Sequence, residues 1–368
     1  MPEQGTRGRT RGSGRRQWAV LAVGAVVAVA VGGLVLSTVS GSDDGPDGTG
    51  TPGATTTRTR SNGVEPGRAI AERESAAAAF PGGLAHQPDQ DGQAARRAAE
   101  ARADGERATA EQIDVIADQP VATWLTNPSE SVTRQVVRRV VRGAEQQHRT
   151  PVFVLYAIPD RDCGSYSAGG TAEDAYLPWV RSAVRAMAGS HAVVLVEPDS
   201  IAQIHVCERL GRERLRLLDR VVDELAGHGL TVYLDGGNED RVPVTEMARW
   251  LRAAGVDRTQ GFATNVSNFY RVDTERAYAD RLADAIGGDP HFVIDVSRNG
   301  QGWRGTWCNP EGAGLGQAPH VTAGSTRLDA LLWVKTPGLS DGTCNGGPAA
   351  GQWWESYALA LVEHRQRD

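Results

Sequence analysis

Apolar runs that end in a polar or ionisable residue recur along the chain from residue 121 onward. The run 192–196 leads through Glu197 and Pro198 to Asp199, and the run 230–234 leads directly to Asp235. Such short, apolar, β-branched runs are typical of buried strands. The other runs, with the polar residues that follow them, are 121–125, 153–158 (Asp162), 262–264 (Asn265), 292–296 (Arg298) and 331–334 (Lys335 and Asp341).

Between these runs, apolar residues recur three and four positions apart, which predicts amphipathic helices. The spacing is visible at 132–140, 215–225, 247–251 and 278–286. Strands that alternate with helices of this length require parallel pairing and right-handed crossovers. We therefore predict an α/β domain with a closed or nearly closed sheet of about seven parallel strands. The polar strand ends would meet at one rim, where α/β barrels carry their active sites.

The first 80 residues differ in composition from the rest. Residues 1–17 carry five arginines and precede the apolar stretch 18–36, which is close to the roughly 20 residues that span a bilayer. The arginines are expected to stay cytoplasmic and the remainder to be exported. A transmembrane anchor and a signal segment cleaved after Ser40 both remain open. We predict a flexible Gly/Pro/Thr-rich stalk at 37–80 and a catalytic domain at 81–368, outside the cell.

Composition narrows the chemistry of this domain. The net charge of −6 gives no electrostatic footprint for nucleic acid. The four cysteines lack CxxC spacing, so we expect neither a zinc site nor any other metal or cofactor. An exported chain can form disulfides, and the residues alone leave three pairings open. Nine Trp against five Phe suit surfaces on which sugar rings stack.

Carboxylates outnumber cations at the predicted rim, and no Ser/His or Cys/His signature accompanies them. Glycoside hydrolysis needs two carboxyl functions across the scissile bond, one of them held protonated. Asp199 is the best candidate for the acid, because it follows a strand and Pro198 stiffens the turn before it. Burial, or a like charge such as Asp162, would have to raise the pKa of Asp199. A single aspartate would more commonly be a helix cap, but several converging strand ends weaken that interpretation.

Seven segments, in order and at compatible spacings, resemble glycoside hydrolase family 6, the cellulases that cut β-1,4-glucan with inversion. The similarity begins near residue 113 and implies a distorted (β/α) barrel with fewer than eight strands. The segments are 156–164 (YAIPDRDCG), 196–199 (VEPD), 233–237 (YLDGG), 264–268 (TNVSN), 295–300 (DVSRNG), 307–310 (WCNP) and 333–338 (WVKTPG) followed by Asp341.

The resemblance implies roles for four aspartates. Asp199 would be the general acid, and Asp162 would raise its pKa and help to relay a proton from the attacking water. Asp341 would be a candidate base, with Asp162 acting through a water chain as the other option. Asp235 would lie nearby and shape the electrostatics of the site.

The resemblance also implies substrate contacts and cysteine pairs. Tyr156 would lie beneath the distorted sugar, and Trp124 and Trp307 would be sugar platforms. For Trp333 the core and the cleft are equally open. The remaining substrate-binding candidates are Asn265, Asn268, Arg298 and Lys335. The implied disulfides are Cys163–Cys207 and Cys308–Cys344.

The chain also departs from the family pattern. The segment 238–240 lacks the histidine and the nearby tryptophan that usually follow Asp235, and Leu339 stands where a glutamate is usual. The segments 300–307 and 338–351 are short, which favours an open cleft that cuts inside chains. We therefore expect a monomeric endo-acting β-1,4-glucanase whose partner is a β-glucan. The alternatives are a non-catalytic glucan-binding or wall-associated protein and a hydrolase of another β-linked envelope glycan.

Overall fold

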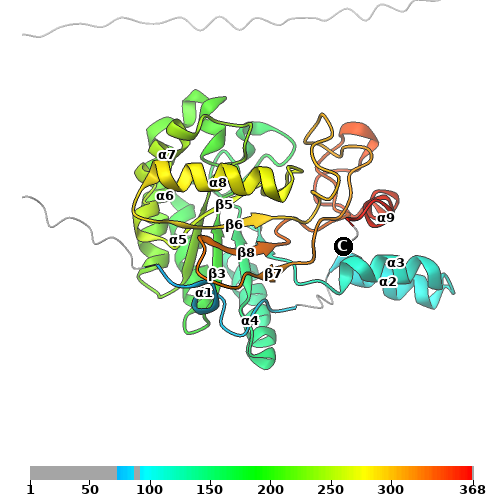
Figure 1. Ribbon diagram of the computed structural model, residues 1–368. Coiled ribbons are helices and arrows are strands. Elements are labelled where there is room, and N and C mark those ends of the chain that lie inside the picture. Colours follow the sequence, from blue (N-terminus) through cyan, green and yellow to red (C-terminus); the bar gives the residue numbers. More distant parts are fainter. Residues whose placement is uncertain (1–72, 87–91, 367–368) are drawn as a thin grey trace, which may run out of the picture. The chain divides into compact units, whose positions relative to one another are not determined.

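One curled sheet forms the centre of the computed structural model, which describes residues 73–86 and 92–366 (Figure 1). The strand order is β1-β2-β3-β4-β5-β6-β8-β7, parallel throughout except for β7 against β8. The strands are β1 (Thr123–Leu125), β2 (Val152–Leu155), β3 (Val193–Val196), β4 (Thr231–Asp235), β5 (Gly261–Thr264), β6 (His291–Asp295), β7 (His320–Val321) and β8 (Leu328–Leu332). The predicted α/β class and the parallel strands are confirmed, whereas the two-residue β7 was not predicted.

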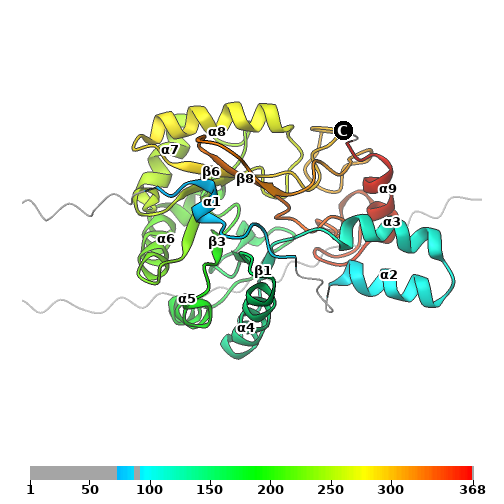
Figure 2. The same ribbon diagram turned by 60° about the horizontal axis from the view of Figure 1, so that its bottom comes forward.

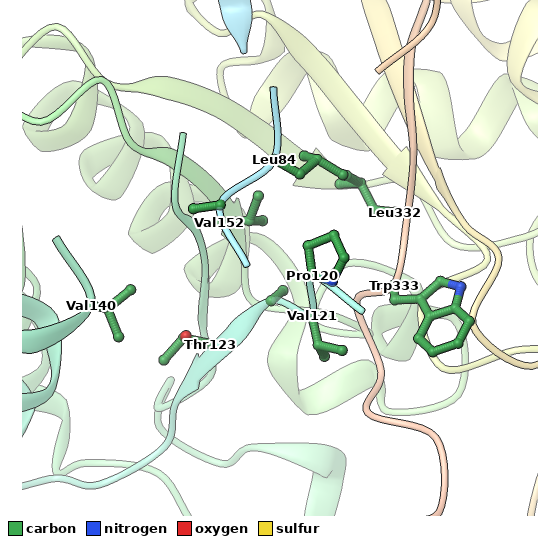
Figure 3. Close-up of a pocket in the computed structure, with 10 residues that line it drawn as sticks. Leu84, Pro120, Val121, Thr123, Val140, Val152, Leu332 and Trp333 are labelled. Carbon is green, nitrogen blue, oxygen red and sulfur yellow. The ribbon is translucent and has the colours of Figure 1, made fainter. Parts of the chain in front are cut away.

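The sheet curls far enough for its first and last parallel strands to meet. Ala122, just before β1, donates its backbone N–H to the carbonyl of Trp333, just after β8, at 3.0 Å. Beside this seam lies a small apolar crevice of about 10 Å³, lined by residues such as Val121, Val152 and Leu332 (Figure 3). That volume is about what one water molecule needs, and none of the predicted catalytic aspartates lines the crevice.

Helices on the outside of the sheet connect consecutive strands from β1 to β6 (Figure 1). They are α4 (Glu130–Gln147), α5 (Glu173–Met187), α6 (Gly211–Ala226), α7 (Val244–Ala253) and α8 (Val272–Ile286). Each buries one face against the strands; in α6 this face includes Leu218, Val221, Val222 and Leu225. The helical spacing thus predicted four of these five helices, and α5, which contains Pro178, was missed.

A helical hairpin, α2 (Gln93–Ala103) and α3 (Arg107–Ala117), lies beside the last helix, α9 (Glu355–Glu363) (Figure 2). Arg97 of α2 forms an ion pair with Glu355 of α9. Across residues 73–86 and 92–366, no helix combines the length and the apolar character needed to cross a bilayer. The predicted basic segment 1–17, the apolar segment 18–36 and most of the predicted stalk lie outside the described residues.

The end of the predicted stalk is packed rather than extended, so its boundary at residue 80 is too late. Helix α1 (Ala76–Ala79) leads to Phe80, which is 1% exposed and stacks on Tyr233 at 6.4 Å between ring centroids. Gln260 binds the backbone of Glu74 through both ends of its amide. Phe80 fills the sheet interior with inward-facing residues two apart on each strand, among them Val154, Val193, Leu195, Val293, Ala330 and Leu332.

Candidate active site

Three predicted aspartates meet at the carboxyl ends of β2, β3 and β4. The backbone N–H of Asp199 donates to Oδ2 of Asp235 at 2.9 Å. Gln203, in the turn after Asp199, donates from Nε2 to Oδ1 of Asp162 at 2.9 Å. Its backbone N–H donates to the carbonyl of Asp199 at 2.8 Å, so Gln203 fixes Asp162 and Asp199 relative to each other. The spacing of the motifs gave no signal for Gln203.

The surroundings of Asp162 and Asp235 favour their protonated forms. Burial raises the pKa of Asp162; the N–H of Ser167, which donates at 2.8 Å, opposes this rise, and the charge of Asp199 adds to it. Asp235 is 4% exposed, and burial followed by the charge of Asp199 raises its pKa to about 7. Burial and the charge of Asp199 therefore both favour protonation of Asp162 and Asp235.

Arg241 supplies the counter-charge of this cluster. Its Nη1 lies 3.3 Å from Oδ1 of Asp199, and both side chains are about one-third exposed. The charge of Arg241 opposes the rise in the pKa of Asp162 and of Asp235. Arg241 lies just beyond the segment that departs from the family pattern, and sequence reasoning did not identify it.

Asp341 lies in a second charged group with Arg298 and Lys335. Nη1 of Arg298 binds both carboxylate oxygens at 3.0 and 2.8 Å, and Nζ of Lys335 lies 3.2 Å from Oδ1. The N–H of Asn309 donates to Oδ2 at 3.0 Å. Burial would favour the neutral acid, but Arg298 and Lys335 hold the pKa of Asp341 below its ordinary value. Asp341 is therefore a buried carboxylate, 6% exposed, that stays ionised.

Two fully buried acids lie beneath the rim. Both carboxylate oxygens of Glu197 accept the backbone N–H of Ala157, at 3.0 and 3.1 Å, and Oε1 accepts the hydroxyl of Tyr176 at 2.7 Å. Asp295 binds the loops after β5, β6 and β8 together, by accepting four backbone N–H groups. Their donors are Ser267, Ser297, Val334 and Lys335. Both acids lie within the family motifs, but sequence reasoning gave them no role.

Aromatic rings gather beside Asp162. Trp124 meets Tyr156 edge to face, with centroids 5.0 Å apart, and the guanidinium of Arg161 lies 4.7 Å from the centroid of Tyr156. Tyr166, on the loop after β2, meets Trp307, on the loop after β6, at 6.0 Å. Trp307 is 43% exposed, so one face of its indole is available for a ligand.

Two of the candidate substrate-binding residues are buried in the structure. Trp333 is 3% exposed and its Nε1 donates to the carbonyl of Gln317 at 2.8 Å, so it belongs to the core. Asn265 is fully buried, and its amide binds the backbone of Tyr270 and the carbonyl of Asp295. Asn268 is half-buried in the same loop, where its Nδ2 donates to the carbonyl of Val266 at 3.2 Å.

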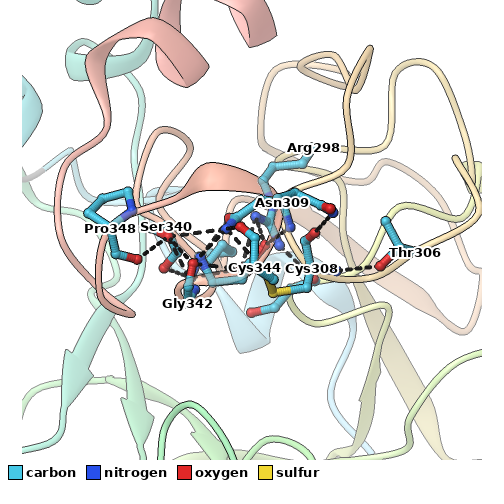
Figure 4. Close-up of a disulfide and its surroundings, with 12 residues drawn as sticks. Arg298, Thr306, Cys308, Asn309, Ser340, Gly342, Cys344 and Pro348 are labelled. Carbon is cyan, nitrogen blue, oxygen red and sulfur yellow. Dashed lines mark hydrogen bonds and ion pairs between the residues drawn. A yellow bond between two sulfur atoms is a disulfide. The ribbon is translucent and has the colours of Figure 1, made fainter. Parts of the chain in front are cut away.

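Both implied disulfides are confirmed. Cys163–Cys207 joins the loops after β2 and β3, with 6.5 Å between Cα atoms, and Cys308–Cys344 joins the loops that flank Asp341, with 6.2 Å. Around the second bridge, Nδ2 of Asn309 donates to the carbonyl of Gly342 at 2.8 Å (Figure 4). Each bridge therefore fixes a loop that carries a predicted catalytic aspartate.

A curled parallel sheet with clustered carboxyl groups and exposed aromatic rings at its carboxyl rim has the parts that glycoside hydrolysis requires. Within the described part of the chain, no His, Cys, Asp and Glu side chains form a group of three or more that could hold a metal ion. The chain belongs to the glycosyl hydrolases family 6, whose model matches residues 83–365.

Individual relatives agree with this assignment. The chain is 40% identical over 253 residues to endoglucanase A of Cellulomonas fimi, a match that covers 68% of this chain but only 56% of that protein. It is 36% identical over 290 residues to endoglucanase 1 of Streptomyces halstedii, covering 74% of this chain and 87% of that protein. A solved endoglucanase from Mycobacterium tuberculosis, in complex with methyl-cellobiosyl-4-deoxy-4-thio-β-D-cellobioside, aligns with a TM-score of 0.71 and 35% identity. That alignment covers 76% of this chain and 96% of that one.

A further buried acid lies behind the cluster. Glu275 of α8 is 0% exposed, and its Oε1 accepts the backbone N–H of Glu239 at 3.0 Å. Burial raises the pKa of Glu275 from 4.5 to about 8. Folding at neutral pH therefore requires Glu275 to take up a proton, since the unfolded chain leaves it ionised.

Replacement Glu275→Gln should remove this pH dependence. Below pH 4.5 Glu275 is protonated in both states, and between about 4.5 and 8 it is protonated only in the folded protein. The wild type should therefore lose stability relative to the variant by up to about 1.4 kcal/mol per pH unit across that window. Urea unfolding from pH 4 to 8 measures the difference, and Glu213→Gln, an exposed glutamate of α6, controls for loss of charge. If the free energies of unfolding of the wild type and Glu275→Gln differ by the same amount at every pH from 4 to 8, the raised pKa of Glu275 is contradicted.

Proposed function

We propose that the protein hydrolyses internal β-1,4-glucosidic bonds of cellulose or a related β-glucan with inversion of anomeric configuration. The observation that carries the proposal is the junction of Asp162, Asp199 and Asp235 at one rim, beside exposed aromatic rings. Among the relatives, several are named endoglucanases, and others are named probable 1,4-β-D-glucan cellobiohydrolases.

Asp199 would act as the general acid. Its proton passes to the glycosidic oxygen as the bond to the anomeric carbon breaks, which leaves a neutral leaving sugar. Two contacts orient Asp199: its backbone N–H donates to Asp235, and its side-chain Oδ1 pairs with Arg241. Oδ2 is then the oxygen left to approach the glycosidic bond.

The attacking water would pass its proton to the ionised form of Asp162 through a chain of water molecules. Inversion places this water on the face of the sugar opposite the acid. Asp162 has a raised pKa and is held by Gln203 and Ser167. Asp341, the other candidate base, has a lowered pKa and binds two cations. A carboxylate in that state is a weak proton acceptor, so we assign it the electrostatic role of fixing the cations Arg298 and Lys335.

Endo action is proposed from two features. The loops 300–307 and 338–351 are short, and the bacterial relatives named above are called endoglucanases. Tyr166 and Trp307, on the loops after β2 and β6, have ring centroids 6.0 Å apart, and both side chains are exposed, at 49% and 43%.

An endo-acting enzyme should lower the viscosity of carboxymethylcellulose early, while few reducing ends have formed. Each internal cut shortens a chain greatly, whereas a cut at a chain end hardly changes its length. Viscosity and reducing ends would be followed in the same sample. Cellobiose release at nearly constant viscosity would contradict endo action and indicate attack from chain ends.

We also propose that the domain works outside the cell, anchored by or released from the segment 18–36. The support is the pair of disulfides, which persist in oxidising compartments. Detection of the protein with reduced thiols in the cytoplasmic fraction of its host would contradict this location.

Asp199→Ala should slow the hydrolysis of substrates whose leaving group needs a proton much more than that of substrates whose leaving group needs none. Loss of a general acid lowers the rate by about 10²–10⁴-fold, so we expect this loss on cellohexaose. Hydrolysis of 2,4-dinitrophenyl β-cellobioside should fall far less, because its leaving group needs no proton. Asp273→Asn, an exposed aspartate in the first turn of α8, is the matched control. Equal losses on both substrates would contradict the role of Asp199.

Oligosaccharide binding without any product from the wild type would favour a glucan-binding protein.

A further inference from the structure

Two aromatic rings outside the predicted site form a parallel stack. Tyr270, in the segment after β5, and Trp303, in the loop after β6, have ring centroids 5.1 Å apart and planes inclined by 5°. Trp303 is 41% exposed and Tyr270 is half-buried. The stack covers one face of the indole and leaves the other side of Trp303 open to solvent.

The segments that carry Tyr270 and Trp303 are held by hydrogen bonds that do not involve the indole ring. The backbone of Tyr270 is held by Asn265 on its N–H and carbonyl, at 3.1 Å each, and by Nδ2 of Asn299 at 3.0 Å. The loop that carries Trp303 is anchored by backbone hydrogen bonds from Gly300 to Gly314 and from Gly302 to Asn299, each at 3.0 Å. An exposed aromatic ring on a loop already fixed by its backbone is free to serve a ligand.

Polar contacts connect the stack to the catalytic acid. The hydroxyl of Tyr270 donates to Oδ2 of Asp240 at 3.4 Å. Asp240 is followed in the chain by Arg241, whose guanidinium pairs with Asp199 at 3.3 Å. A series of contacts and chain neighbours therefore leads from Asp199 to Trp303. Its members, in order, are Arg241, Asp240, Tyr270 and Trp303.

Trp124 and Tyr156 form a second aromatic pair, with ring centroids 5.0 Å apart. Tyr156 packs under the guanidinium of Arg161, which precedes Asp162 in the chain. The two aromatic pairs come from different elements: Trp124 and Tyr156 lie in β1 and just after β2, and Tyr270 and Trp303 lie in the segments after β5 and β6. If the cleaved sugar lies over Tyr156, the pairing of Asp199 with Arg241 favours the side of Arg241 for the part of the glucan that departs.

We propose that Arg241, Asp240, Tyr270 and Trp303 form a subsite that binds neutral β-linked glucosyl units on the leaving-group side of the cleft. The inference rests on the proposed function. A glucosyl ring presents an apolar face of C–H groups that fits against the open indole face of Trp303. The hydroxyls at its edge can donate to Asp240 and accept from Arg241.

The charges favour a neutral sugar over a uronic acid. Asp240 and Arg241 have opposite charges, and Arg241 is already paired with Asp199. A carboxylate on the sugar would meet Asp240 and Asp199 as like charges, which disfavours its binding.

The position of the cut in cellopentaose tests this subsite. The reducing end would be labelled with ¹⁸O, and mass spectrometry of the products would identify which bond was broken. With Trp303→Ala, weaker binding on the leaving-group side should move the cut toward the reducing end. Cuts that release two glucosyl units from the reducing end should become rarer relative to cuts that release one, and their ratio should fall by about threefold to tenfold. Trp303→Phe should restore most of the wild-type ratio.

Trp307→Ala is the matched comparison, because Trp307 lies in the same loop with similar exposure. If Trp307 binds the sugars on the non-reducing side, its removal should move the cut in the opposite direction. An unchanged pattern in Trp303→Ala, or a shift in the same direction as Trp307→Ala, would overturn the proposed subsite.

Failure of the proposed function would look different, because the wild type itself would then give no product. The subsite would in that case be tested by calorimetric titration with cellopentaose. Trp303→Ala should weaken binding by about threefold to tenfold, and an unchanged dissociation constant would overturn the subsite. Urea unfolding of the variant would show that its fold is intact.

Discussion

Hydrogen bonds from loop backbone to buried carboxylates hold the active rim together. Glu197 binds the segment after β2, Asp235 binds Asp199, and Asp295 binds the loops after β5, β6 and β8. Several residues of these turns have positive φ, among them Glu197, Asp199 and Asn265. Such conformations cost about 1–3 kcal/mol each and persist only where the surroundings fix them. Each of these hydrogen bonds contributes about 0.5–1.5 kcal/mol, and together they offset this cost.

Charge divides the site into two parts with different tasks. Beside Asp199, which pairs with Arg241, burial raises the pKa of both Asp162 and Asp235, so these two groups tend to hold protons. Around Asp341, two cations face one carboxylate, which stays ionised. A reaction that delivers a proton from one group while stabilising positive charge on the sugar ring needs both states at the same pH.

The strands could be predicted because parallel strands are buried on both faces and appear as continuous apolar runs. The aspartates could be predicted because they follow those runs directly. Gln203 and Arg241 could not, since they reach the site only through the path of a loop, which has no periodicity. Trp333 was ambiguous because an indole suits both a core and a cleft, and the sequence does not show that the carbonyl of Gln317 accepts its Nε1–H. The cysteine spacing left three pairings, which only the family resemblance resolved.

The central claim is that these aspartates cleave a β-1,4-glucan by a single displacement with water. Proton NMR of the first products from cellohexaose, recorded before mutarotation, tests it most directly. We expect new reducing ends in the α-anomeric form, because water enters on the face opposite the bond that breaks. New reducing ends in the β-anomeric form would contradict the account, since they require a covalent intermediate on the enzyme.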